Sequence, residues 1–398
     1  MFRALRHQNF RLFFASQAVS ILGSWMQQIA LAWLVYRTTG SAFLLGVVTF
    51  ANQAPILFIA PFSGLLADRF DRRKMLIVTQ SLAAGQALLL AVLTLSGLIE
   101  AWHIIVLALF YGIAMGLDTP VRQSLLIDMI GDRADLPNAI ALNSFLMNSG
   151  RLIGPSIAGV LLLYVSEGIC FLINAASFLG VVWVATRLPS KPRSTEIPAG
   201  YLRALAEALE YMWKTETIRL LLALVASIAF FASSYLVLMP VFARDVFGGG
   251  SETLGFLVGA AGFGAVVGTA YLAGRGRVET LPRRLMSTSI LAGVALALVG
   301  LSETLWIALP LMVCLGFGII VTAASANMVI QSIVPDEKRG RIVSFYAASF
   351  LGVMPLGALV AGSLAGAIGA PATATVFGVC CVLLGTVLGA KLRSKRSR

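Results

Sequence analysis

Charged residues are scarce in this sequence, and the scarcity excludes a soluble protein. Asp, Glu, Lys and Arg make up only 12% of the 398 residues, whereas 58% are hydrophobic, and the mean hydropathy is +0.89. A soluble chain of this size would carry about twice that charged fraction. Apolar runs of about 20 residues recur without the alternation of β-barrel strands, so they predict membrane-spanning helices. We therefore expect an all-α integral membrane protein.

Residues that perform enzymatic or metal chemistry are also rare. Histidine occurs only twice, at His7 and His103, both near predicted membrane edges. The four cysteines lie within apolar segments without the spacing of a metal site, which indicates buried free thiols. The sequence has no nucleophile–base grouping and no glycine-rich ATP loop of the Walker type. We therefore expect neither an enzyme nor a bound metal or cofactor, and no direct use of ATP.

Turn-forming residues and charges divide the apolar sequence into twelve predicted spans. The spans are expected at residues 11–36, 42–66, 74–97, 103–127, 137–164, 168–187, 218–243, 252–274, 284–302, 305–330, 342–368 and 372–391. The first span follows three arginines, as the apolar part of a signal peptide would. It continues to Tyr36 without a small-residue cleavage site, so we expect a retained helix.

Basic residues are distributed unequally between the two sides of these spans. One side holds 26 of the 30 Lys and Arg residues; the exceptions are Arg37 and Arg244 on the other side, and Arg122 and Arg151 within spans. Because basic loops stay in the cytoplasm, we expect both termini on the cytoplasmic side of a bacterial-type inner membrane. The net charge of +12 is explained by this topology and indicates no nucleic-acid partner.

The sequence repeats weakly at an offset of 208 residues. NFRLFFA at 9–15 matches TIRLLLA at 217–223, and RQSLLID at 122–128 matches IQSIVPD at 330–336. Between the repeats lies a proline-containing connection with the amphipathic segment YLRALAEALEYMWK at 201–214, which we expect on the cytoplasmic membrane surface. We therefore predict two pseudo-symmetric six-helix bundles, at 1–187 and 218–398, joined by a linker at 188–217.

The loop GLLADRFDRRKML at 64–76 concentrates six charges in seven residues between two apolar spans. Five of its residues match the signature of the loop between the second and third spans of the major facilitator superfamily: Gly64, Asp68, Arg69, Arg73 and Lys74. The chain resembles this superfamily over its whole length. Asp71 stands where that signature has its second glycine. With RTTGSA at 37–42 and TPVRQSLL at 119–126, the loop resembles the transmembrane secretion effector subgroup, which includes the enterobactin exporter and macrolide efflux proteins.

The resemblance implies that four loop residues form a conformational latch that favours the outward-facing state. These residues are Gly64, Asp68, Arg69 and Arg73. Gly64 permits close approach of two helices, and Asp68 can accept hydrogen bonds from the N-terminus of another helix. The alternative is that the basic residues only orient the protein in the membrane. We favour this alternative for Arg72 and Lys74.

Three ionisable residues stand inside apolar spans, where one charge costs about 2.5–3.5 kcal/mol on insertion scales. Asp118 lies ten residues before Asp128, which is about 15 Å along a helix, and Arg122 follows Asp118 by one turn on the same face. We expect Asp118, Arg122 and Arg151, with Asn148 one turn before Arg151, to line a central cavity that contacts substrate or coupling ion. The alternative is a neutralised charge cluster that holds the fourth and fifth helices together.

Asp118 is the one acidic residue that this assignment places near the membrane midplane. It is therefore the candidate carrier if protons drive the protein. Acidic residues at the periplasmic ends of spans are interpreted as solvated loop charges. These residues are Glu100, Glu167, Asp245, Glu252 and Glu303.

The fifth span contains NSGRLIGPSIAG at 148–159. Gly150, Gly154 and Pro155 resemble the helix-bending motif of facilitator antiporters, although one residue is added before the final glycine. Glycines at four-residue spacing permit close packing, and proline bends helices. The motif favours export over import. The eleventh span, at 342–368, is similarly rich in glycine and proline.

These observations predict a secondary active transporter that exports small amphipathic molecules, such as drugs or siderophores, by alternating access with proton coupling. The expected partners are a small-molecule substrate, a proton or other coupling ion, and membrane lipid. An importer of the same fold is the first alternative. A membrane sensor or assembly protein that transports nothing is the second.

Overall fold

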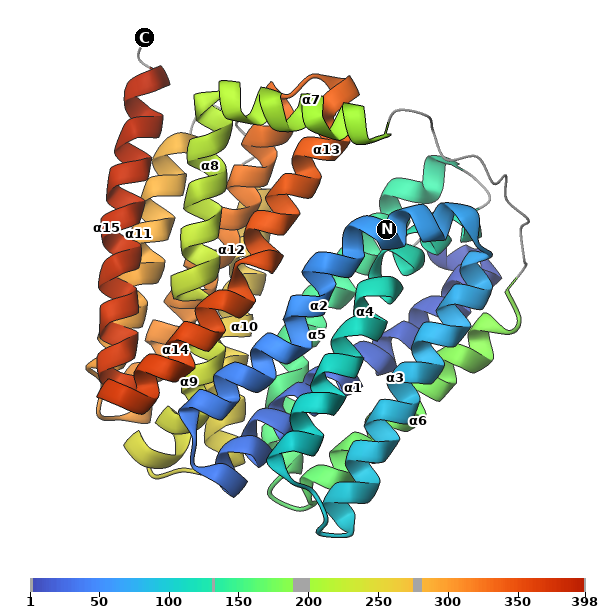
Figure 1. Cartoon of the computed structure of the whole chain (residues 1–398), viewed down its shortest axis with the longest axis vertical. Helices are drawn as coiled ribbons and strands as arrows, with labels where there is room; N and C mark the ends of the chain where they lie inside the picture. The colour runs from blue at the N-terminus through green and yellow to red at the C-terminus, as the bar shows by residue number, and fades with distance from the viewer. Residues whose placement is uncertain (1–2, 131–132, 189–200, 275–280, 397–398) are drawn as a thin grey trace. The chain divides into compact units, whose positions relative to one another are not determined.

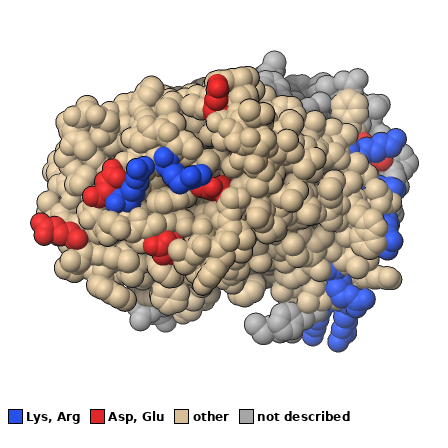
Figure 2. All heavy atoms as spheres, turned by 90° about the horizontal axis from the view of Figure 1, so that it is seen from below, with Lys and Arg blue, Asp and Glu red and all other residues tan. Residues whose placement is uncertain are grey.

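The computed structural model describes residues 3–130, 133–188, 201–274 and 281–396, with the backbone alone for 60–69, 127, 133, 148, 201–205, 281–283, 336, 395 and 396. Every regular element in these residues is a helix, which confirms the all-α fold. Ten described helices are long and apolar enough to cross a membrane. The predicted span at 284–302 contains a shorter apolar helix, Arg284–Gly300. The helix of the predicted span at 137–164 is neither one of the ten nor a shorter apolar helix by the same measure. Figure 2 shows one end of the molecule, where a few Asp, Glu, Lys and Arg side chains stand among uncharged residues.

The chain divides into two compact units, one formed by Met1–Gly40 with Ala51–Ile197 and the other by Ser41–Phe50 with Pro198–Arg398. The first unit contains η1 (Arg3–Arg6), α1 (Gln8–Thr39), most of α2 (Ala42–Arg69), α3 (Arg72–Leu95), α4 (Ala101–Met129), η2 (Arg133–Asp135), α5 (Leu136–Leu161) and α6 (Glu167–Ala185) (Figure 1). The first residues of α2 belong to the second unit. Residues 189–200 of the predicted linker lie outside the described residues, so the predicted bundle boundaries stay a prediction.

The second unit contains the remaining helices and three π-helical turns. They are α7 (Tyr201–Lys214), α8 (Glu216–Ser227), η3 (Ile228–Ala232), α9 (Tyr235–Val241), η4 (Phe242–Val246), α10 (Ser251–Ala273), α11 (Leu281–Gly300), α12 (Leu305–Ile333), α13 (Asp336–Ala347), η6 (Ala348–Gly352), α14 (Met354–Ile368) and α15 (Ala370–Arg396). The π-helical turns interrupt the predicted seventh and eleventh spans, whereas α1 and α5 of the first unit are continuous α-helices.

Local sequence signals explain where several helices begin and end. Gly40 follows α1 with a left-handed backbone (φ 62°), and its N–H closes the helix onto the carbonyl of Tyr36. Asp71 precedes α3, and its side chain accepts hydrogen bonds from the backbone N–H groups of Arg73 and Lys74. The aspartate that departs from the superfamily signature is therefore the N-cap of the third span.

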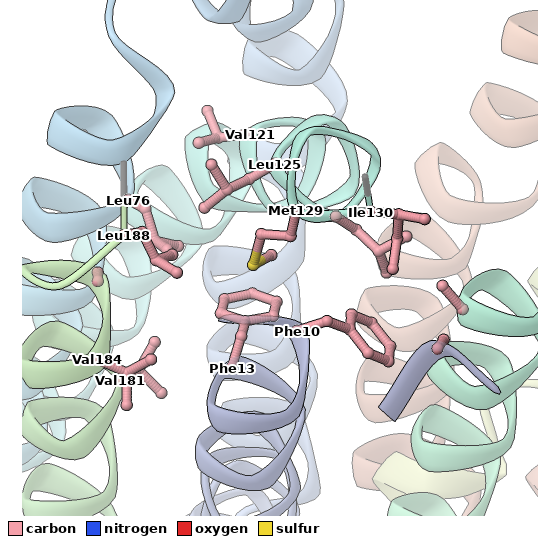
Figure 3. Packing of buried hydrophobic residues seen from close by; sticks show 14 of the residues in the cluster. Phe10, Phe13, Leu76, Val121, Leu125, Met129, Ile130, Val181, Val184 and Leu188 are labelled. Carbon is pink, nitrogen blue, oxygen red and sulfur yellow. The ribbon is translucent and has the colours of Figure 1, made fainter. Parts of the chain in front are cut away.

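An apolar cluster fills one end of the first unit. Phe10 and Phe13 of α1 lie beneath Met129 of α4, with Leu76 of α3 and Val184 of α6 on one side (Figure 3). All five are buried. With its residues on α5, the cluster joins five helices of the unit and fixes their spacing at this end.

Glycines allow the helices of the second unit to approach closely. A Cβ atom added to Gly264 of α10 would overlap the carbonyl oxygen of Val313 on α12. In the reverse direction, a Cβ atom on Gly316 of α12 would overlap the carbonyl oxygen of Ala261 on α10. Small residues at such contacts let van der Waals packing hold membrane helices together.

The amphipathic helix α7 lies across one end of the second unit (Figure 1). Ala208 is buried in an apolar cluster of this unit, whereas Leu209 and Trp213 are 42% and 60% exposed. On another face, Lys214 donates a hydrogen bond to Glu210 and lowers the pKa of that carboxyl. The predicted contact of α7 with the membrane surface stays a prediction.

Candidate functional site

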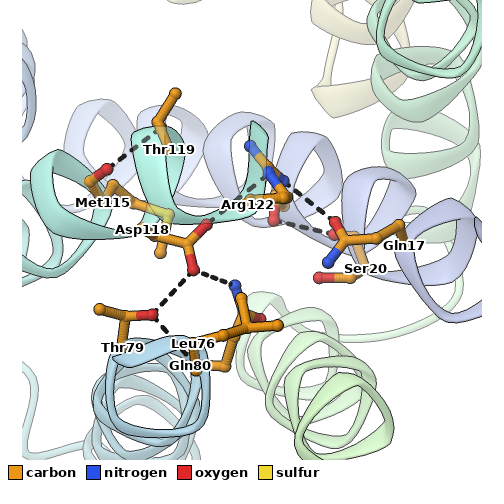
Figure 4. Close-up of polar contacts among 10 residues, drawn as sticks. Gln17, Ser20, Leu76, Thr79, Gln80, Met115, Asp118, Thr119 and Arg122 are labelled. Carbon is orange, nitrogen blue, oxygen red and sulfur yellow. Dashed lines mark hydrogen bonds and ion pairs between the residues drawn. The ribbon is translucent and has the colours of Figure 1, made fainter. Parts of the chain in front are cut away.

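Asp118 is completely buried, and its carboxyl group is held by α3. One oxygen, Oδ1, accepts hydrogen bonds from the Thr79 hydroxyl and from Nε2 of Gln80, both at 2.8 Å (Figure 4). The two donors are adjacent on α3 and are themselves buried. These bonds replace part of the hydration that the carboxyl group loses in the membrane interior.

Arg122 lies one turn after Asp118 and links this carboxyl group to α1. Its Nε is 3.8 Å from Oδ2 of Asp118, which is an ion-pair distance but too long for a hydrogen bond. Its Nη1 donates a 3.0 Å hydrogen bond to Oε1 of Gln17 on α1. The pairing of Asp118 with Arg122 therefore has the geometry that their spacing predicts, and it lies within one unit between α1, α3 and α4.

Three buried polar atoms around this carboxyl group have no hydrogen-bond partner among the described residues. They are Oδ2 of Asp118, Oε1 of Gln80 and Nε2 of Gln17. Buried polar groups in proteins are nearly always hydrogen-bonded. Three such atoms around one carboxyl group are an exception to this rule among the described residues.

Arg151, the third charge predicted in the membrane, does not join this network. Its side chain is half-buried on α5, and among the described residues it has no hydrogen bond or ion pair. The side chain of Asn148, which was predicted to accompany it, lies outside the described residues. The structure thus brings Asp118 and Arg122 together and leaves Arg151 apart from them. A role for these four residues in a substrate cavity stays a prediction.

The glycines of the fifth span face α1. A Cβ atom on Gly150 would overlap the side chain of Ile21, and one on Gly154 would overlap the side chain of Trp25. Pro155 follows inside the continuous helix α5. The spacing of the two glycines therefore produces a close α1–α5 contact, while bending at Pro155 stays a prediction.

The charged loop is tied to helices of its own unit. Arg73 donates a hydrogen bond to the carbonyl oxygen of Thr186 at the end of α6. Arg72 makes a 2.9 Å ion pair with Asp128 and a 3.1 Å hydrogen bond to the carbonyl oxygen of Ser124, both on α4. The interpretation of Arg72 as an orientation charge alone is therefore wrong. The other three predicted latch residues, Gly64, Asp68 and Arg69, belong to α2, and their side chains lie outside the described residues.

Glu167 was predicted to be a solvated loop charge, and this prediction is wrong. Its side chain is only 8% exposed and accepts two hydrogen bonds from Arg37, at 2.8 and 3.1 Å. The pair joins the end of α1 to the start of α6. The two residues are 130 positions apart, so the sequence alone did not indicate their contact.

Several polar residues of the network were not predicted as site residues. Gln17, Thr79 and Gln80 contact Asp118 or Arg122 directly. A second buried chain runs from Asn174 through Gln27 to Gln86, with hydrogen bonds of 2.8 and 3.1 Å between α6, α1 and α3. Glutamines within apolar runs could have indicated buried polar networks. Their positions in the sequence do not show which of them contact Asp118 or Arg122 and which belong to the second chain.

Comparison with known proteins assigns the family. The profile of the transmembrane secretion effector family matches residues 1–397. The chain belongs to this family. It is therefore an integral membrane protein of a transport family within the major facilitator superfamily, and the resemblance predicted from its motifs is confirmed.

Individual relatives agree with this assignment. The chain is 28% identical to the staphyloferrin A transporter of Staphylococcus aureus, with 97% of each chain covered. It is 26% identical to the multidrug efflux pump Tap of Mycolicibacterium fortuitum, with 92% of this chain and 91% of the relative covered. Among solved structures, the nucleoside transporter NupG superposes with a TM-score of 0.73 at 16% identity, over 96% of this chain and 99% of that one. This last likeness concerns the fold alone.

Proposed function

We propose that this protein exports small amphipathic molecules, of the drug or siderophore kind, by alternating access, and that protons drive the export through Asp118. Relatives that cover nearly the whole chain include a staphyloferrin A transporter and a multidrug efflux pump. The contact of Gly150 and Gly154 with α1 is consistent with the antiporter motif that favours export.

The proton-coupling part of the proposal depends on one observation. Asp118 is completely buried, and one of its two carboxyl oxygens has no hydrogen-bond donor among the described residues. A carrier of protons needs a carboxyl group whose surroundings accept both the charged and the neutral form. Arg122 lies 3.8 Å from this oxygen, Oδ2, at ion-pair distance.

The charge balance favours substrates with an anionic group. Asp118 and Arg122 lie within ion-pair distance of each other, whereas Arg151 has no acidic partner among the described residues. We assign Arg151, with Asn148, to the contact with substrate, where its guanidinium can bind a carboxylate in two-pronged geometry.

The proposed orientation places both termini in the cytoplasm, with the protein in the bacterial cytoplasmic membrane. The basic loops support it, because Lys and Arg near span ends stay on the cytoplasmic side. In this orientation the latch residues Gly64, Asp68, Arg69 and Arg73 are cytoplasmic. We assign them to contacts that hold the outward-facing state.

Transport in inverted membrane vesicles tests this function. Vesicles containing the protein, energised so that their interior is acidic, are given a panel of dyes and siderophores. We expect gradient-dependent accumulation inside the vesicles for an exporter. Movement in the opposite sense indicates an importer, and no flux of any solute indicates a sensor or assembly protein.

Asp118→Asn tests the coupling residue. The amide keeps the shape of the carboxyl group but cannot exchange a proton at neutral pH, so we expect gradient-driven accumulation to fall to the level of vesicles without the protein while substrate counterflow continues. Asp128→Asn is the matched control, because it makes the same change at the end of the same helix and should keep gradient-driven transport. Unchanged gradient-driven transport in Asp118→Asn would remove Asp118 from the mechanism.

A further inference from the structure

The two oxygens of the Asp118 carboxyl group have unequal surroundings. Oδ1 accepts two hydrogen bonds, from Thr79 and Gln80, whereas Oδ2 has none among the described residues. The amide of Gln80 also has one bonded and one unbonded atom. Its Nε2 donates to Oδ1 of Asp118, whereas its Oε1 has no partner in the described part of the chain. Asp118 and Gln80 are 0% and 2% exposed. Two acceptor atoms are therefore buried and unpaired on groups that already share one hydrogen bond.

One proton would satisfy both atoms. A carboxylate only accepts hydrogen bonds, whereas a protonated carboxyl group also donates one. An amide presents a donor and an acceptor side by side, so it can form two antiparallel hydrogen bonds with a neutral carboxylic acid. The first of these bonds, from Nε2 of Gln80 to Oδ1 of Asp118, is present at 2.8 Å. The second would run from a protonated Oδ2 to Oε1 of Gln80.

The position of Arg122 agrees with a neutral carboxyl group. A guanidinium beside a carboxylate forms short, charge-assisted hydrogen bonds. Arg122 instead donates to the neutral amide oxygen of Gln17 at 3.0 Å and leaves its Nε 3.8 Å from Oδ2. The arginine is close enough to take over Oδ2 with a small movement if the proton leaves.

We propose that Gln80 is a positioning residue that holds the protonated form of Asp118 through a paired acid–amide contact, and that Arg122 replaces it as the partner of Oδ2 when the carboxyl group ionises. The inference rests on the proposed role of Asp118 in proton coupling. On ionisation, the O–H bond at Oδ2 breaks, the proton passes to a water molecule, and the freed lone pair accepts an N–H of Arg122. The protonated state thus favours the contact of Asp118 with Gln80, which joins α4 to α3. The ionised state favours the ion pair of Asp118 with Arg122, both on α4.

Few other charged groups face this site. On α4, the Arg122 guanidinium and the Tyr111 phenol interact electrostatically with Asp118. The neighbouring groups on α3 are the neutral Thr79 and Gln80, and the one on α1 is the neutral Gln17. The described side chains of α2, at residues 42–59, are all neutral, and Ile59 packs against Gly116 of α4. Arg122 is therefore the main competitor of Gln80 for this carboxyl group.

Infrared difference spectroscopy of the whole protein in lipid vesicles tests the contact. Titration between acidic and neutral pH should reveal a carboxylic-acid C=O band that Asp118→Asn removes. Because Gln80 donates to Oδ1, the C=O stretch of the acid is lowered by the hydrogen bond. Gln80→Met should shift this band to higher frequency. Gln86→Met is the matched control, since Gln86 is a buried glutamine of the same helix bonded to Gln27, and it should leave the band in place.

The outcomes separate this inference from the proposed function. A band that Asp118→Asn removes but that Gln80→Met leaves unmoved would overturn the role of Gln80 while keeping Asp118 as the proton carrier. Absence of any such band between acidic and neutral pH would overturn both. If Gln80→Met does not accumulate, Gln80→Asn, whose shorter amide cannot complete the pair, should give the same upward shift. In the unmodified protein, the band must lie at the frequency of a hydrogen-bonded acid and shift in D2O; a free-acid frequency would contradict the contact.

Discussion

Arg37 and Glu167 form one ion pair, but removing Arg37 should destabilise the first unit more than removing Glu167. Nε and Nη2 of Arg37 donate to the two carboxylate oxygens of Glu167 at 2.8 and 3.1 Å. The Glu167 side chain is 8% exposed, whereas that of Arg37 is 52% exposed. Removing either residue breaks the same two hydrogen bonds. The side chain left behind is a buried carboxylate in one case and a half-exposed guanidinium in the other.

The difference in burial sets the expected magnitudes. Arg37→Met leaves a buried carboxylate without its cation; breaking a fully buried pair costs about 3–5 kcal/mol. Because Arg37 itself is half exposed, we expect a smaller cost, about 2–3 kcal/mol. Glu167→Gln leaves an arginine that water can solvate, and the amide oxygen keeps one acceptor, so we expect about 1 kcal/mol. Glu167 also lies in the first turn of α6, where a negative charge adds about 0.3–1 kcal/mol.

Thermal unfolding of the purified protein in lipid nanodiscs, followed by tryptophan fluorescence, measures this order. Arg37→Met should unfold at a lower temperature than Glu167→Gln. The double variant should be more stable than the sum of the two single losses predicts, because it no longer contains an unpaired buried carboxylate. A Glu167→Gln variant that is as unstable as Arg37→Met, or single losses that simply add, would refute the reasoning from burial.

Two further changes test packing and helix capping by the same unfolding measurement. Gly264→Ala and Gly316→Ala should each destabilise the second unit by about 1–3 kcal/mol, because the added Cβ overlaps a backbone carbonyl of the facing helix. Gly85→Ala is the control and should be neutral, since no atom lies within 4 Å of its new Cβ. Equal effects at the three positions would contradict the close α10–α12 contact. Asp71→Ala should lower the free energy of unfolding by about 1 kcal/mol, because α3 loses its N-cap. Asp71→Asn should lower it less, because asparagine also caps helices. An Asp71→Ala variant as stable as the unmodified protein would contradict the capping role.

Composition and periodicity were sufficient to predict the architecture, because membrane helices must satisfy their backbone hydrogen bonds internally and need long apolar runs. The loop at 64–76 indicated the superfamily in another way, because its residues match the signature of that family. Weaker runs were harder to assess. The fifth predicted span contains Arg151, and its helix α5 is not among the ten apolar helices.

The site was predicted only where its partners lie on one helix. Asp118 and Arg122 are four residues apart, so helical geometry brings them to the same face. Thr79, Gln80 and Gln17 reach them from other helices, and the register of those helices depends on side-chain packing that no local pattern encodes. The same limit explains the error at Glu167, whose partner Arg37 lies on α1.

The two units differ in a way that bears on mechanism. All three ionisable residues that the sequence places deep in apolar spans, Asp118, Arg122 and Arg151, belong to the first half. In the second unit, the described helices instead contain three π-helical turns. Glycine contacts in which a Cβ atom would overlap backbone occur in both units, as at Gly112 against Asn52 and at Gly264 against Val313. π-Helical turns often mark functional positions, and small residues let membrane helices approach closely. If proton binding moves Arg122 between Asp118 and Gln17, the chemical change begins in the first unit, and the second unit needs only to accommodate it.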